Sequence, residues 1–90
     1  MTATETAQYL RRHQAYNVIG VVNILARTKG TYRGKVNLGR ATGARGDNGR
    51  CVRPVETARR LGLVTETQEG AALCYTLSYH GWAVRDALAA

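Results

Sequence analysis

The sequence changes its hydrophobic period at Gly62, and this change limits the fold more than any other feature. Apolar residues recur at three-residue steps over 55–61, as on one face of a helix. Over 73–77 they alternate with Cys and Thr, as in a strand. A β-branched run over 63–67 and a polar turn over 68–70 complete a two-stranded hairpin, which needs a helical layer behind it. The sequence therefore predicts an α+β fold.

The amino-terminal helical segment is predicted over 4–28. Thr2 and Glu5 have the spacing of a capping box at its start. One helical face then carries Ala7, Leu10, Gln14, Val18, Val21 and Leu25, widened by Val22 and Ile24. The pattern fits one long helix or two helices jointed near 14–17.

The glycine-rich stretch over 30–50 predicts little regular structure. Its only helical pattern is 36–42, with Val36, Leu38 and Ala41 as inward candidates, and an exposed turn is predicted over 44–49.

Two further helices have clear ends. Pro54 favours the first turn of a helix over 52–62, and Gly62 ends that helix. Ser78 is predicted to cap a closing helix over 79–89, which turns inward Trp82, Leu88 and either Val84 or the aliphatic stem of Arg85.

The basic residues concentrate in the middle of the chain. The net charge is +7, and residues 27–60 carry ten basic side chains against Asp47 and Glu56. Residues 1–26 are near neutral, and residues 61–90 are slightly acidic. A single basic surface of this kind predicts a polyanionic partner, with nucleic acid favoured over a merely solvated charged face.

Enzyme and metal chemistry find little support in the sequence. The carboxylates are few and scattered, and no Ser or Cys stands beside a His in a glycine elbow, so we expect no enzyme. Cys51 and Cys74 lack the close ligand pairing of zinc modules with His13 or His80, so we expect buried structural thiols, no metal and no cofactor.

Length and hydropathy predict one domain over 1–90. No apolar run approaches the ~20 residues that a membrane helix needs, and no basic leader precedes an apolar block. We therefore expect a cytoplasmic protein, associated with the nucleoid if it binds DNA.

The order of these elements resembles the winged helix-turn-helix family of DNA-binding domains. Residues 55–64 (VETARRLGLV) are similar to the end of a recognition helix running into the wing, and residues 75–83 (YTLSYHGWA) to the wing's return strand and the entry to the last helix. Residues 38–43 loosely resemble the first helix of the helix-turn-helix pair. The resemblance implies a mostly helical domain with a helix-turn-helix region over 35–62, a two-stranded wing over 63–77 and a closing helix over 78–89.

The resemblance also implies that helix 52–62 enters the major groove of double-stranded DNA, as in a small transcriptional regulator of bacterial or phage type. Arg53 and Arg60 suit guanine edges or phosphates, and Thr57 allows close approach. Glu56 either accepts from cytosine or, as we favour, tethers Arg53 or Arg60 along the helix. Further DNA-binding candidates are Lys35, Arg40, Arg45 and Arg50 on the preceding helix and turn, with Arg59 at the helix edge.

The sequence also bears on the wing, on alternative partners and on self-association. The wing over 65–70 has two carboxylates and no cation, so we expect it to stay clear of DNA. A structural, ribosome-like RNA-binding protein and a module that binds or inhibits an acidic protein are the alternatives. The apolar stripe over 4–28 predicts a homodimer through that segment.

Overall fold

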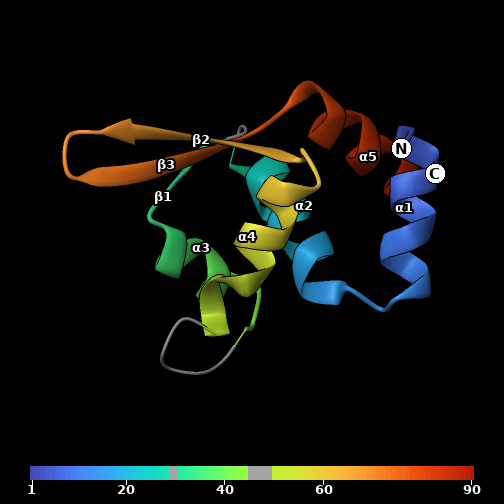
Figure 1. The fold of residues 1–90 in the computed structure, drawn as a ribbon, viewed down its shortest axis with the longest axis horizontal. Helices are drawn as coiled ribbons and strands as arrows, with labels where there is room; N and C mark the ends of the chain where they lie inside the picture. The colour runs from blue at the N-terminus through green and yellow to red at the C-terminus, as the bar shows by residue number, and fades with distance from the viewer. Residues whose placement is uncertain (29–30, 45–49) are drawn as a thin grey trace.

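The computed structural model describes residues 1–28, 31–44 and 50–90. Within these ranges the chain forms five α-helices, one short 3-10 helix (η1) and three strands (Figure 1). In chain order they are α1 (Ala3–Arg12), α2 (Tyr16–Arg27), β1 (Thr31–Arg33), α3 (Lys35–Ala41), η1 (Arg50–Val52), α4 (Arg53–Arg60), β2 (Val64–Glu69), β3 (Ala72–Leu77) and α5 (Tyr79–Ala89). The α+β prediction is confirmed.

The sheet has three antiparallel strands in the order β1-β3-β2. The hairpin β2–β3 pairs Val64 with Leu77 and Glu69 with Ala72, close to the predicted bounds. The prediction of a two-stranded hairpin is wrong in one respect, because β1 pairs with the other edge of β3 and places Tyr32 opposite Tyr75. The three residues of β1 have no apolar run or alternation that would predict a strand. Their extended conformation therefore depends on pairing with β3 in the folded chain.

The amino-terminal segment is two helices rather than one. Thr2 and Glu5 form the capping box, with hydrogen bonds of 3.0 and 3.1 Å. Gln14 lies after α1 with φ 51, in the left-handed region, so the chain turns there and Gln14 is exposed instead of joining the inward stripe.

Helix α1 lies beside α5, with both chain ends near them (Figure 1). The Arg11 guanidinium donates to the Leu88 carbonyl at 2.6 Å, and Thr6 Oγ1 lies 3.2 Å from His80 Nε2. The apolar residues Ala7 and Leu10 are buried within the chain. The stripe that motivated a homodimer is thus covered by the chain's own fold, and the homodimer through 4–28 stays a prediction without that support.

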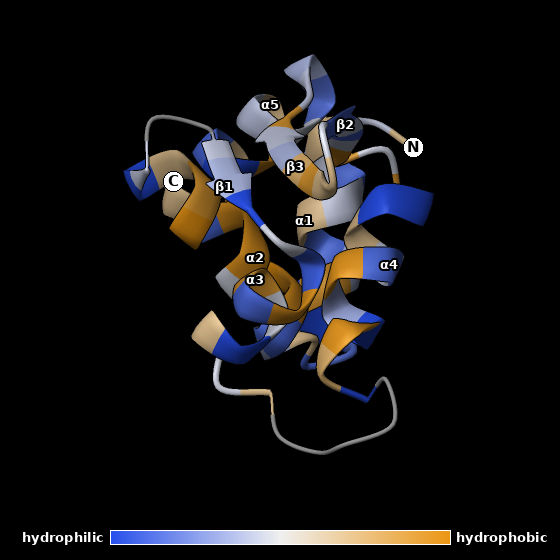
Figure 2. Ribbon diagram, turned by 90° about the vertical axis from the view of Figure 1, so that its left-hand side faces the viewer, coloured by the Kyte–Doolittle hydropathy of each residue, from blue (hydrophilic) through white to orange (hydrophobic). Residues whose placement is uncertain are grey.

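The core lies between the sheet and the helices. Figure 2 shows hydrophobic residues of α2 at the centre of the domain and hydrophilic residues on the outer turns of α4. The fully buried apolar side chains include Leu10, Val21, Val22, Leu25, Leu38, Val55, Leu63, Tyr75 and Val84. Every α-helix and the hairpin contribute to this core, so the elements around α4 share it.

Two glycines decide which helix faces turn inward. A Cβ on Gly39 of α3 would collide with the Cys51 carbonyl, and one on Gly81 of α5 would collide with the Leu63 carbonyl. Backbone therefore packs directly on these glycines.

Several inward predictions fail because of this packing. Val36 and Ala41 of α3 are exposed, and only Leu38 is buried as predicted. In α5, Val84 is buried and Leu88 half-buried, whereas Trp82, beside Gly81, is turned outward and 39% exposed. Among the described helices, none is long and apolar enough to cross a membrane.

Candidate nucleic-acid interface

Helix α4 is held by its apolar side and presents its charged side to solvent. Pro54 lies in its first turn, as predicted, and Gly62 follows its end with φ 76. Pro54, Val55 and Ala58 are buried. The other side of the helix carries Arg53, Glu56, Thr57, Arg59 and Arg60, of which only Thr57 is partly covered.

One border of α4 carries two arginines next to neutral residues. A surface depression of about 340 Å³ is lined by side chains from α2, η1 and α4, and its polar and charged lining residues are Asn17, Arg50, Arg53 and Thr57. We call these four residues the arginine edge. Arg53 and Thr57 are one turn apart on α4, so they share this side of the helix. Among the described residues no carboxylate lines the depression, and both arginines are exposed.

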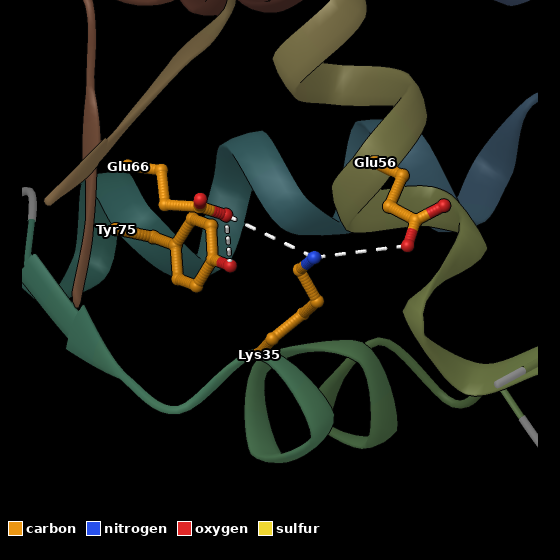
Figure 3. Close-up of polar contacts among 4 residues, drawn as sticks. All are labelled: Lys35, Glu56, Glu66 and Tyr75. Atoms are coloured by element: carbon orange, nitrogen blue, oxygen red, sulfur yellow. Dashed lines mark hydrogen bonds and ion pairs between the residues drawn. The ribbon is translucent and has the colours of Figure 1, made fainter. Parts of the chain in front are cut away.

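The other border of α4 faces an ion-pair cluster formed by Lys35, Glu56 and Glu66, and Tyr75 lies beside Glu66 (Figure 3). The Lys35 Nζ lies 3.7 Å from Glu56 Oε1 on α4 and 3.8 Å from Glu66 Oε2 on β2. The Tyr75 hydroxyl donates to the same Glu66 oxygen at 2.5 Å. One ammonium therefore lies between two carboxylates from different elements.

The titration behaviour of this cluster follows from these contacts. The pKa of Glu66 lies below its usual value, chiefly because the Tyr75 hydroxyl donates to the carboxylate, with the positive charges of Arg59 and Lys35 adding to the effect. The pKa of Tyr75 is raised, first by burial and then by the hydrogen bond to Glu66. Glu66 is thus an anion and Tyr75 a neutral donor at neutral pH.

The structure gives Glu56 a different partner from the one favoured by the sequence. Within the described ranges its ion pair is with Lys35 of α3, and none joins it to Arg53 or Arg60. The prediction of a tether along the helix is therefore wrong. Arg53 and Arg60 lie three and four positions from Glu56, a spacing that allows such a tether. The fold brings the Lys35 ammonium of α3 to Glu56 instead, and the spacing along the helix does not reveal this competitor.

In the described part of the chain, the remaining basic candidates do not line the depression at the arginine edge. Arg40 is exposed beside a shallow depression of about 630 Å³, which Tyr32, Arg33 and Asn37 also line. Arg59 and Arg60 line a third depression with Glu56. Arg45 and the predicted turn around it lie outside the described residues. The structure thus brings together Arg50, Arg53 and Thr57, and places Lys35 and Arg40 apart from them.

Sequence reasoning missed Asn17, Glu66 and Tyr75 as neighbours of this helix. Asn17 is one polar residue at the start of α2 and has no sequence signal. Glu66 and Tyr75 are opposite each other in the register of β2 and β3, so a correct hairpin register would have paired them.

Cys51 and Cys74 are both buried free thiols, which confirms that part of the prediction. In the part of the chain that the structure describes, no group of three His, Cys, Asp or Glu residues could hold a metal ion. No protein-family model, curated protein or solved structure matches this chain.

Proposed function

We propose that this chain binds double-stranded DNA sequence-specifically, as a small transcriptional regulator of the winged helix-turn-helix type, with α4 as its reading helix. The order of α2, α3, α4 and the β2–β3 hairpin supports this assignment. Strand β1 adds a third strand to the sheet without changing that order, so the arrangement is compatible with a winged helix.

The observation that carries the proposal is the face of α4. An α-helix with its side chains is about 10–12 Å in diameter, which fits the major groove of about 12 Å width, and the eight residues of α4 extend about 12 Å along the helix axis. The buried side of α4 fixes the helix to the core, and its solvent side offers three arginines and a threonine next to Arg50. Guanidinium groups bind phosphates and guanine edges in two-pronged contacts, so this face suits a nucleic acid.

Each candidate residue has a distinct role under this proposal. Arg53 and Arg60 read bases, with Thr57 beside them, whereas Arg40, Arg50 and Arg59 contact phosphates, as does Arg45 by prediction. The hairpin stays clear of the duplex, because β2 carries Glu66 and Glu69 and no cation.

The test is a selection from random duplex DNA followed by binding measurements on the selected site and on random DNA. Arg60→Ala should cost about 1–3 kcal/mol on the selected site and much less on random DNA. Arg12→Ala on α1, an exposed arginine far along the chain from α4, is the matched control and should change neither. Equal losses on all sequences would reject Arg60 as a reader, and tighter binding to structured RNA than to duplex DNA would favour the RNA-binding alternative.

A further inference from the structure

Lys35 lies where three elements meet. It is the first residue of α3, and its ammonium reaches Glu56 on α4 and Glu66 on β2. Its side chain is only 24% exposed, and that of Glu66 only 21%. Figure 3 shows the ammonium between the two carboxylates, with the ring of Tyr75 on the sheet side.

This environment is unsuited to a phosphate contact. Two carboxylates within 4 Å already neutralise the ammonium, and Lys35, Glu56 and Glu66 together carry a net charge of −1. A DNA phosphate approaching Lys35 would meet both carboxylates at close range. Arg50 and Arg53, by contrast, line a depression whose lining within residues 1–28, 31–44 and 50–90 has no carboxylate.

The cluster is anchored to the core at one end. Tyr75 is fully buried, and its hydroxyl holds the Glu66 carboxylate. Lys35 continues this contact to Glu56, which is 49% exposed on the outer side of α4. A continuous series of polar contacts thus runs from the core of the sheet to the exposed side of the reading helix.

We infer that Lys35 is a positioning residue of α4 rather than a DNA contact: its ammonium sets the orientation of α4 relative to the hairpin, and with it the way the arginine edge meets the duplex. The effect on DNA rests on the proposed function. The coupling of Lys35 to Glu56 does not, so the two are tested separately.

The first arm needs no DNA. The unfolding equilibrium is measured for the full chain, Lys35→Met, Glu56→Gln and the double variant. In the wild type, Glu56→Gln should raise the unfolding constant about two- to five-fold, the range of a partly exposed ion pair. In the Lys35→Met background the same change should be neutral or stabilising, because Glu56 has then lost its ion-pair partner and only the repulsion between the two carboxylates remains to be relieved. An equal effect in both backgrounds would overturn the inference.

The second arm measures DNA binding against salt. Lys35→Met should reduce the preference for the selected site over random duplex by about ten-fold, at the low end of what a good base contact contributes, and leave the salt slope on random DNA unchanged. Lys35→Arg should restore the preference, because it keeps the cation. A salt slope lower by about one, with equal losses on both DNAs, would show a phosphate contact and overturn the inference.

Two outcomes separate this inference from the proposed function. If Lys35→Met does not fold, Glu56→Gln gives the second arm, since it releases α4 while Lys35 stays beside Glu66. If the wild type does not bind duplex DNA, the proposed function fails and the positioning of a DNA-reading helix fails with it. If the unfolding measurements still show that Lys35 and Glu56 are coupled, the error lies in the proposed function and not in the ion-pair geometry.

Discussion

The two borders of α4 use charged side chains in opposite ways. On the arginine edge, Arg50 and Arg53 line an open depression that has no carboxylate among its described lining residues. In the ion-pair cluster, Lys35 lies between Glu56 and Glu66 and is largely covered. The basic middle of the sequence contributes to both, so a charge count does not tell which cations are available to a polyanion. Availability depends on which carboxylates the fold brings within a few ångströms.

The largest expected effect comes from a substitution that should disturb the arginine edge and the ion-pair cluster together. Gly39→Ala places a Cβ against the Cys51 carbonyl, so α3 and η1 must separate and α4 loses its support. We expect a loss of about 3 kcal/mol or more in the free energy of unfolding, at the upper end for overpacking, measured by urea denaturation.

Gly43→Ala is the control for that change. Gly43 has φ 88 and no neighbour within 4 Å of an added Cβ, so only backbone strain of about 1–2 kcal/mol is expected. Equal losses for the two variants would show that the contact of Gly39 with Cys51 does not support α4.

The next largest effect compares how much the two borders of α4 contribute to DNA binding. Arg53→Ala, on the arginine edge, should cost about 1–3 kcal/mol on the selected site, because it removes an exposed guanidinium that pairs with no carboxylate in the described part of the chain. Arg59→Ala should cost less, because Arg59 lines a depression with Glu56 of the ion-pair cluster and its positive charge also acts on Glu66. Fluorescence anisotropy with labelled duplex measures both, and a larger loss for Arg59→Ala would reverse the assignment of the two borders.

Acid should weaken the ion-pair cluster and leave the arginine edge unchanged. The pKa of Glu66 is lower in the folded chain than in the unfolded one, so its contribution to stability is present above about pH 4.5 and is lost as the pH falls through the folded-state pKa. Tyr75→Phe removes the main cause of the lowered pKa. This variant should therefore be less stable by about 1–2 kcal/mol at neutral pH and lose less on acidification.

Tyr79→Phe is the control for Tyr75, because Tyr79 is 93% exposed on α5. Its pH profile from denaturation at pH 3 to 7 should match that of the wild type. A Tyr75→Phe profile parallel to the wild type would show that the hydroxyl does not hold Glu66 in its ionised form.

The fold could be predicted from the sequence where local patterns decide it. The closing helix has the predicted bounds, and Ser78 caps it by accepting from the Gly81 N–H at 2.9 Å. The hairpin and α4 were likewise predicted, because a proline, a glycine and a change of period mark their ends.

The remainder depends on tertiary contacts. Strand β1 exists only by pairing with β3, and Trp82 faces outward because Gly81 takes the close contact with Leu63. At the candidate site, the face of α4 was predicted, but the pairing of Lys35 with Glu56 and Glu66 was not. These three residues lie on separate elements and share no periodic spacing.

The smallest expected effect lies at the hairpin tip. Glu69 is exposed, and the described side-chain hydrogen bond to its carboxylate is a weak one from the Cys74 Sγ at 3.6 Å. Glu69→Ala should change the free energy of unfolding by less than about 0.5 kcal/mol. DNA binding should stay the same or tighten slightly, since a repelled carboxylate is removed. Clearly weaker binding would show that the hairpin contacts the duplex.

The most direct test of the account is the salt dependence of duplex DNA binding by the wild type and by Arg50→Ala. We expect the logarithm of the binding constant to fall linearly with the logarithm of salt concentration, and Arg50→Ala to lower this slope by about one on any sequence. Binding that is absent at low salt, or that does not respond to salt, would contradict the central claim that the basic face of α4 holds DNA.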